Sequence, residues 1–253
     1  MQITANGFIG WAPDRNDELF ISTSSGSDSL QRFNDSLKTK PADWYYRDKV
    51  ITYKRNVNGH RCKNIEEINL NNYFLAIGCS HTEGVGLILE DTYAYSLSNQ
   101  LNCDYYNLGL GGSGIDVLQY NLLTWMAKIK QKPKFIVFQH PHENRFALVD
   151  DYEIKLQGSW TKVKESNEFL ILADKLNYFS SKYKLIEVLI ENVIDVPIIH
   201  LHIPYKYGFE FTETPTSIVV DPNIDKARDD IHFGVETNKK ITSDILQKLQ
   251  SII

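Results

Sequence analysis

A serine, a histidine and an aspartate are the side chains of this sequence whose types and spacing could do chemistry. Ser80 stands in "AIGCSHTEGVG" (76–86), directly after an apolar run. A serine hydroxyl is a poor nucleophile at neutral pH unless a histidine accepts its proton and a carboxylate orients that histidine. Near the C-terminus, "ARDDIHFG" places Asp229 and His232 three residues apart, a spacing at which a carboxylate can face an imidazole. Together the two segments predict a nucleophilic serine.

A nucleophilic serine also needs hydrogen-bond donors for the negative charge that develops on the substrate oxygen. The segment "NLGLGGSG" (107–114) could supply backbone N–H groups, because glycines leave the backbone open to close approach. The segment "QHPHENR" (139–145) includes the side-chain amide of Asn144. His140, His142 or Arg145 could supply a donor in its place, and the sequence does not choose among these three.

Short apolar segments alternate with longer amphipathic ones from residue 72 onwards. Strands joined by helices of this length form a parallel sheet with both faces covered. We therefore expect an α/β fold over residues 71–253, a three-layer α/β/α sandwich with a mostly parallel, flavodoxin-like sheet, and an irregular N-terminal extension over residues 1–70 that packs on this core. The predicted strands are 73–78, 104–109, 134–140, 196–203 and 216–220, and the predicted helices are 91–101, 114–130, 167–193 (one long helix or a pair) and 238–253.

The polar segments follow these predicted strands in order. In an open parallel sheet, ligands bind at the carboxyl ends of the strands, near the point where the winding order reverses. Ser80 follows the first strand, the glycine segment follows the second, and "QHPHENR" follows the third. We therefore expect the three segments to meet at one edge of the sheet.

These segments, in this order, resemble the SGNH (GDSL-type) hydrolase family over roughly residues 50–253. "YKRNVNGHR" (53–61) is also similar to the lead-in of some members from bacterial and phage genomes. In the third block the family has glycine–x–asparagine–aspartate where this chain has "HPHEN", so Asn144 takes the asparagine's place only with a one-residue slip and Glu143 occupies the direct register. The matching residues are Gly78-Cys79-Ser80 in the first block (with Cys79 in the aspartate position), Gly112 in the second, and Asp229, His232 and Gly234 in the last.

The resemblance implies ester hydrolysis in which Ser80 is the nucleophile, His232 the base and Asp229 the orienting carboxylate. It further implies that the N–H groups of Ser80 and Gly112, with the side chain of Asn144, bind the oxyanion. The sequence shows no long apolar lid and no interfacial amphipathic helix, so we expect a small acyl group, such as acetyl, on a carbohydrate or small ester. Two alternatives stay open: an O-acyltransferase with the same three residues, and a non-catalytic carbohydrate-binding or structural module that retains the fold.

The remaining histidines have simpler interpretations. His81 follows Ser80 directly and is too close along the chain to be its base, so we expect it to shape the pocket. The pairs "HPH" (140–142) and "HLH" (200–202) could together bind a transition metal such as zinc. No cysteine or acidic cluster accompanies them, so we predict buried, hydrogen-bonded histidines, with His202 as a candidate wall of the pocket, and no metal or cofactor.

The glycine segment also invites a comparison with dinucleotide-binding loops. Residues 109–114 give GxGGxG after a predicted strand, and the glycines at 109, 111 and 114 have the spacing of the GxGxxG pattern. No acidic residue closes a second strand about 20 residues further on, as ribose binding requires. We therefore do not expect nucleotide binding.

Composition limits the remaining classes of function. The 253 residues are 42% hydrophobic, enough for one α/β domain, and the net charge of −5 with scattered basic residues argues against a nucleic-acid partner. The three cysteines form no CxxC pair and fit reduced thiols. With no signal-peptide pattern and no stretch near the ~20 apolar residues that cross a bilayer, we expect a cytoplasmic or virion-associated protein without a membrane partner. The sequence leaves the oligomeric state open.

Overall fold

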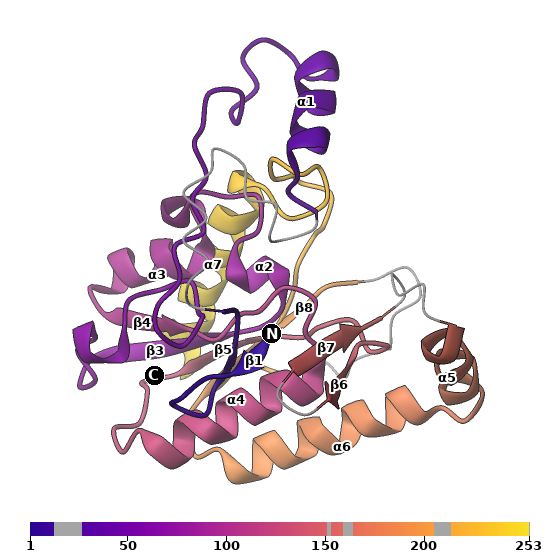
Figure 1. Ribbon diagram of the computed structural model, residues 1–253. Coiled ribbons are helices and arrows are strands. Elements are labelled where there is room, and N and C mark those ends of the chain that lie inside the picture. The colour runs from indigo at the N-terminus through magenta and orange to yellow at the C-terminus, as the bar shows by residue number, and fades with distance from the viewer. Residues whose placement is uncertain (13–26, 151–152, 159–163, 205–213, 253) are drawn as a thin grey trace.

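A five-stranded parallel sheet forms the centre of the structure (Figure 1). The computed structural model describes residues 1–12, 27–150, 153–158, 164–204 and 214–252. Numbered along the chain, the strand order is the 2-1-3-4-5 order of flavodoxin-like sheets, which confirms the predicted fold class. In spatial order the strands are β4 (Asp104–Asn107), β3 (Tyr73–Ile77), β5 (Ile136–Gln139), β8 (Ile198–His202) and β9 (Ser217–Val219).

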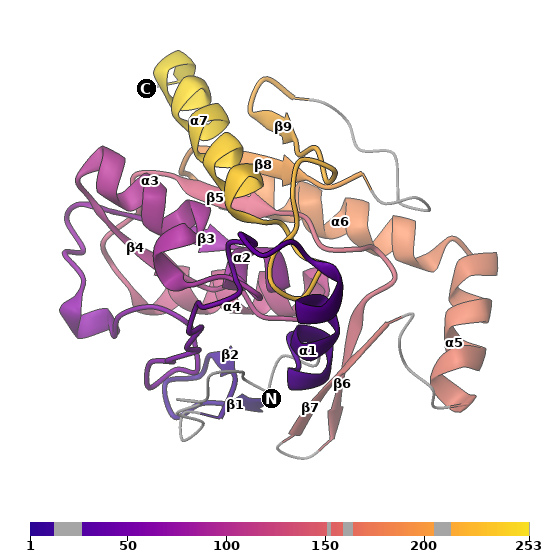
Figure 2. The same cartoon turned by 90° about the horizontal axis from the view of Figure 1, so that it is seen from above.

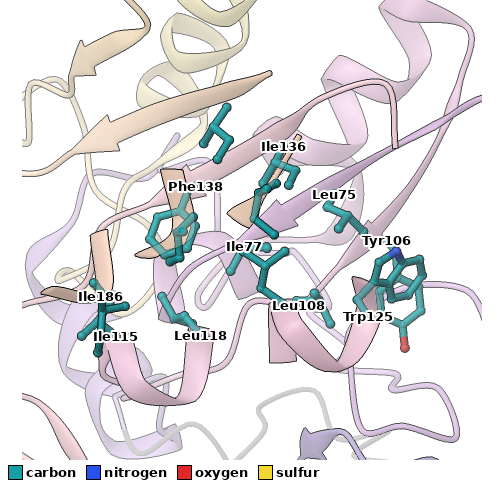
Figure 3. Close-up of a cluster of buried hydrophobic side chains, with 14 of the residues drawn as sticks. Leu75, Ile77, Tyr106, Leu108, Ile115, Leu118, Trp125, Ile136, Phe138 and Ile186 are labelled. Carbon is teal, nitrogen blue, oxygen red and sulfur yellow. The ribbon is translucent and has the colours of Figure 1, made fainter. Parts of the chain in front are cut away.

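The central strands are apolar because helices cover both of their faces. All residues of β3, β5 and β8 are buried, as expected of interior parallel strands. Successive side chains of β3 point to opposite faces of the sheet. Leu75 and Ile77 therefore pack into one hydrophobic core (Figure 3), whereas Phe74 and Ala76 pack into a second core on the other face.

Two helices lie against each face, which gives the predicted three layers (Figure 2). On one face α4 (Ile115–Lys128) and α6 (Tyr178–Val193) close the first core. On the other face α3 (Tyr93–Leu101) and α7 (Val235–Ile252) close the second.

The predicted helical segment 167–193 is a pair of helices rather than one. The first is α5 (Lys164–Lys175), and α6 begins at Tyr178. Asn177, between them, has a φ of 50°, in the left-handed region that asparagine tolerates better than most residues. The change of backbone conformation at this asparagine ends one helix and starts the next.

A second, antiparallel sheet lies beside the main one and was not predicted. Its spatial order is β2 (Ile9–Gly10), β1 (Gln2–Ile3), β7 (Glu153–Gln157) and β6 (Phe146–Asp150). Gln2 pairs with Glu153, so this sheet joins the start of the chain to the segment that follows β5. The N-terminal extension thus contributes two of its four strands.

The first 70 residues are less irregular than expected. They contain α1 (Leu30–Thr39), whose first turn is capped by Ser29, and a 3-10 turn at Ile65–Glu67. Phe8 is buried in the first core against Trp125 of α4.

Two further short helical segments, α2 (Ser80–Glu83) and a 3-10 turn at Leu89–Asp91, follow β3. No helix within the described ranges is both long and apolar enough to cross a membrane.

Candidate active site

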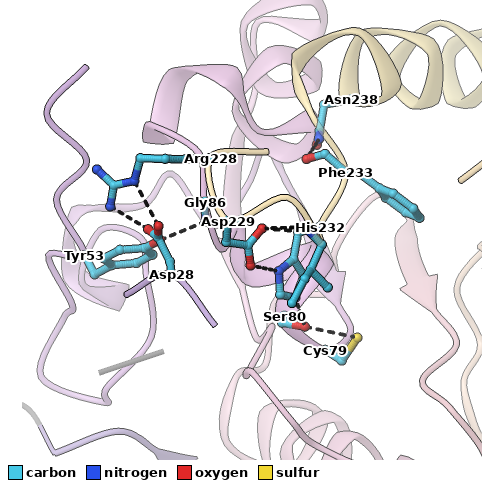
Figure 4. A network of polar contacts seen from close by, with 12 residues as sticks. Asp28, Tyr53, Cys79, Ser80, Gly86, Arg228, Asp229, His232, Phe233 and Asn238 are labelled. Carbon is cyan, nitrogen blue, oxygen red and sulfur yellow. Dashed lines mark hydrogen bonds and ion pairs between the residues drawn. The ribbon is translucent and has the colours of Figure 1, made fainter. Parts of the chain in front are cut away.

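Ser80, His232 and Asp229 form one chain of hydrogen bonds at the carboxyl end of β3 (Figure 4). The Ser80 Oγ lies 2.7 Å from the Nε2 of His232. The Nδ1 of the same ring lies 2.5 Å from the Asp229 Oδ2. The structure therefore joins two segments 152 residues apart in the order that a serine nucleophile, its base and an orienting carboxylate require.

Tight packing fixes the turn from β3 into α2, which carries Ser80. A Cβ on Gly78 would lie 2.2 Å from the Thr82 Oγ1 and 2.6 Å from the Gln139 Oε1, so only glycine fits there. The Cys79 N–H donates to the same Gln139 oxygen at 2.8 Å, which ties the turn to the neighbouring strand β5. Ser80 is the first residue of α2, where a backbone N–H has no partner within the helix.

The Asp229 carboxylate is held by its own loop. Its Oδ1 accepts the N–H groups of Ile231 at 3.1 Å and His232 at 3.0 Å, which leaves Oδ2 to face the imidazole. Burial raises the pKa of this carboxyl, but the hydrogen bond from the His232 ring and the two backbone N–H groups outweigh it and lower the pKa from 3.8 to about 2. The carboxylate is therefore charged throughout the neutral pH range.

A buried ion pair braces this loop against the N-terminal extension (Figure 4). Arg228 donates to the two Asp28 oxygens at 2.9 and 2.6 Å, and both side chains are almost fully buried. Tyr53 donates to Asp28 at 2.5 Å and accepts the Gly86 N–H at 2.8 Å. Removing one partner of such a buried pair typically costs about 3–5 kcal/mol of stability. The extension thus helps to fix the residue next to Asp229, a role that the sequence did not reveal.

The glycine segment lies beside the nucleophile, as predicted. A Cβ on Gly111 would lie 3.7 Å from the Ser80 Cβ, and Gly112 has a φ of 80°, a conformation that favours glycine. Within the part of the chain that the structure describes, the N–H groups of Ser80 and Gly112 donate no hydrogen bond. Two open donors next to a serine hydroxyl have the chemistry of an oxyanion hole.

No protein-family model matches the chain, and no curated protein sequence matches it significantly. Among solved structures, the chain is similar to a family two carbohydrate esterase from Clostridium thermocellum, with 14% identity over 72% of this chain and 65% of that one, and a TM-score of 0.42. An acetyl xylan esterase from Butyrivibrio proteoclasticus is 15% identical over 75% and 66% of the two chains (TM-score 0.37). A G-D-S-L family protein from Desulfitobacterium hafniense is 14% identical over 72% and 73% (TM-score 0.33).

Asn144, the predicted third oxyanion donor, lies at a different pocket. With His142 and Glu143 it lines a cavity of about 270 Å³ whose other wall comes from α5 and α6. Its backbone N–H donates to the His142 Nδ1 at 3.4 Å, and none of its hydrogen bonds within the described ranges reaches Ser80 or Gly112. Its contribution to the oxyanion site stays a prediction.

His81 lies against the proposed base, and the Arg145 charge acts on His81. The His81 ring centroid is 4.8 Å from that of His232 and 3.9 Å from that of Phe233. Burial, then the nearby His232 and Arg145 charges, hold the pKa of His81 well below 6.5. His81 is therefore a neutral side chain against the His232 ring, and its role in shaping a substrate pocket stays a prediction.

Three of the four strand histidines form a buried cluster next to β5. The Nε2 of His140 lies 2.8 Å from the Nδ1 of His200, and the other ring nitrogen of His140 contacts the Tyr183 hydroxyl. His202 stacks on His140 with centroids 4.2 Å apart and ring planes 15° apart. Although one nitrogen of each ring lies within 4.8 Å of the others, stacked rings cannot both hold one metal ion in their planes. Hydrogen-bonded neutral imidazoles account for the arrangement, and His142 lies outside it.

This histidine cluster makes stability sensitive to acid. Burial lowers the pKa of His200 and His202 from 6.5 to about 4, with the His200 charge adding to the effect on His202. The unfolded chain therefore binds more protons than the folded chain between about pH 6.5 and 4, and the free energy of unfolding falls as the pH drops through this window. Urea unfolding at pH 7 and pH 5 measures this loss.

Two variants separate the cluster from the other titrating groups. His202→Gln removes one of the three imidazoles, so its loss of stability between pH 7 and pH 5 should be smaller than that of the wild type. Gln100→Ala, an exposed substitution on α3 that removes no titrating group, should lose about as much as the wild type. Equal losses in the wild type and His202→Gln would show that the cluster does not cause the acid sensitivity.

Proposed function

We propose that the chain is a serine ester hydrolase of the SGNH type. The hydrogen-bonded chain from Ser80 through His232 to Asp229 carries the proposal, because a nucleophile, a base and an orienting carboxylate stand within bonding distance. The open N–H groups of Ser80 and Gly112 beside the hydroxyl support it. Such a combination serves acyl transfer better than any binding function.

The reaction follows from this geometry in two halves. The Ser80 Oγ attacks the ester carbonyl while the His232 Nε2 takes its proton, and the resulting oxyanion accepts hydrogen bonds from the N–H groups of Ser80 and Gly112. The imidazolium then gives its proton to the leaving alkoxide, and an acyl-serine remains. Water, deprotonated by His232, attacks this acyl-serine, and the imidazolium then returns the proton to the Ser80 Oγ as its bond to the acyl carbon breaks and the acid is released. Asp229 stays ionised and holds the Nδ1 proton throughout.

In this proposal the two backbone donors alone support a weaker enzyme, and a third donor from a side chain would raise its rate. Losing one donor in such a site costs about 2.7–4 kcal/mol of transition-state stabilisation. Asn144, Arg145 or His202 could approach a bound substrate from the β5 and β8 side, and we retain them as candidate substrate-binding residues. His81 forms the wall next to His232.

The substrate that we propose is a small ester, with an acetylated carbohydrate as the preferred class. The same three residues would serve an acyltransferase, in which a sugar hydroxyl replaces the attacking water. Product analysis after incubation with an acetyl donor, with and without a sugar acceptor, separates the two: free acetate in both mixtures indicates hydrolysis, and an acetylated sugar indicates transfer.

Labelling with a fluorophosphonate, followed by peptide mapping, tests the proposed nucleophile. The native protein should take up one label on the peptide that contains Ser80, and heat-denatured protein should take up none, because only the folded site activates the hydroxyl. Ser96 on α3 offers an internal comparison and should stay unlabelled. Absence of labelling, or a label on a different serine, would favour the non-catalytic module.

A further inference from the structure

A buried ion pair contacts the backbone of the glycine segment. The Glu83 Oε1 accepts a hydrogen bond from the Arg55 guanidinium at 3.0 Å, and the two side chains are 2% and 0% exposed. The other oxygen of the same carboxylate, Oε2, accepts the Gly111 N–H at 2.6 Å. One carboxylate therefore links the N-terminal extension to the residue that precedes Gly112.

Glu83 lies on the same short helix as the nucleophile. It is the last residue of α2, and Ser80 is the first. A second bond from this helix supports the glycine segment, since the Asn107 side chain donates to the Thr82 carbonyl at 2.8 Å and accepts the Gly109 N–H at 2.8 Å. The segment is thus tied at Gly109 and Gly111 to the helix that carries Ser80, which leaves the N–H of Gly112 available.

The negative charge of Glu83 needs a compensating positive charge, which Arg55 supplies. A carboxylate close to a developing oxyanion opposes it, and a buried carboxylate without a partner is costly in itself. Arg55 supplies the compensating charge, and its guanidinium stacks over the Trp11 ring at 5.4 Å. The Trp11 Cζ2 would lie 3.9 Å from a Cβ on Gly111, so Trp11 packs against the same segment.

We propose that Glu83 is a positioning residue that fixes the Gly112 N–H towards the oxyanion, and that Arg55 is the counter-charge that allows a carboxylate to do this. The inference rests on the proposed function, because it assigns a partner to the oxyanion site of that reaction. It also gives the N-terminal extension a part in the chemistry through Arg55. Both residues lie within segments quoted from the sequence, Arg55 in 53–61 and Glu83 in 76–86, but their types and spacing did not indicate this role.

The comparison of Glu83→Ala with Glu83→Gln tests the positioning role. Alanine removes the acceptor of the Gly111 N–H, so kcat should fall about 100-fold with little change in KM, the size of effect expected when a catalytic group is displaced by about 1 Å. Glutamine keeps one acceptor oxygen and should recover most of that loss. Equal kcat values for the alanine variant and the wild type would overturn the proposal.

Asp104→Ala is the matched control. Asp104 also accepts a backbone N–H, from Asn69 at 2.8 Å, and a cationic side chain, Lys63 at 3.0 Å, but it stands at the first residue of β4, away from the glycine segment. Its removal should leave kcat close to the wild-type value. A loss as large as that of Glu83→Ala would mean that any missing carboxylate loosens the site, and would count against a specific role.

Hydrogen–deuterium exchange of the peptide that contains Gly111 gives a readout without catalysis. Exchange should be faster in Glu83→Ala than in the wild type, Glu83→Gln and Asp104→Ala. If the protein proved to hydrolyse no ester, this pattern would still establish that Glu83 holds the loop, so the two proposals fail separately. Unchanged exchange in Glu83→Ala would overturn the positioning role even in an active enzyme.

A second pair of variants serves if Glu83→Ala does not fold, which circular dichroism would show. Arg55→Met leaves the carboxylate without its counter-charge and should lower kcat. Adding Glu83→Gln to Arg55→Met removes the uncompensated negative charge of the carboxylate and keeps an acceptor oxygen for the Gly111 N–H. The double variant should therefore recover part of the lost kcat. A double variant slower than Arg55→Met would contradict the counter-charge role.

Discussion

Ser80→Ala should lower kcat for p-nitrophenyl acetate on the order of 10⁶-fold, the loss seen when the nucleophile of a serine hydrolase is removed. The reason is geometric: the hydroxyl that His232 deprotonates at 2.7 Å is gone, and no other described hydroxyl bonds to that ring nitrogen. The oxyanion donors remain, so a residual rate above that of water alone should persist. Initial rates at saturating substrate, with circular dichroism to show that the variant folds, measure the effect.

Cys79→Ala is the control for this experiment because the thiol is the neighbouring nucleophile. Cys79 is fully buried, and its Sγ lies 3.9 Å from the Ser80 Oγ. The Cys79→Ala variant should keep most of the wild-type rate. Loss of turnover in Cys79→Ala with full activity in Ser80→Ala would assign the chemistry to the thiol, and equal rates in all three proteins would mean that the ester is cleaved elsewhere.

The central sheet was predictable because its signal is local. Buried parallel strands are short apolar runs, and the intervening helices carry a helical period, so β3, β4, β5, β8 and β9 were found at their places. The antiparallel sheet was missed for two reasons. β1 and β2 are two residues long and leave no periodic pattern. In β7, exposed Glu153, buried Ile154 and exposed Lys155 do alternate, and this signal could have been used.

The proposed triad was predictable because each motif is compact. Asp229 and His232 are three residues apart, and Ser80 follows a recognisable strand, so the sequence suggested the contact that the structure contains. Contacts between distant, individually ordinary residues leave no such signature. Arg55 and Glu83 are separated by 28 positions, and Asp28 and Arg228 by 200, so neither ion pair could be read from spacing. Their importance follows from burial, which only the fold determines.

Asp229→Asn should lower kcat about 10⁴-fold while leaving the fold intact. The amide oxygen of the new side chain can still accept the N–H groups of Ile231 and His232 that Oδ1 accepts now, so the amide N–H₂ takes the place of Oδ2. A donor then faces the Nδ1 of His232 instead of an acceptor. The neutral ring must present its lone pair to that donor and carry its proton on Nε2, where it can no longer accept the proton of Ser80. Initial rates with p-nitrophenyl acetate measure the loss.

Asp230→Asn is the matched control for this tautomer effect. Asp230 is the next residue, is exposed, bonds to Lys40 at 2.6 Å, and has a φ of 60° that asparagine tolerates. Its replacement removes the same charge one position away and should leave kcat near the wild-type value. If both variants lost activity equally, the general charge of the loop would explain the effect. If neither lost it, His232 would not need Asp229 to hold its Nδ1 proton, and the assignment of the triad would be wrong at its third member.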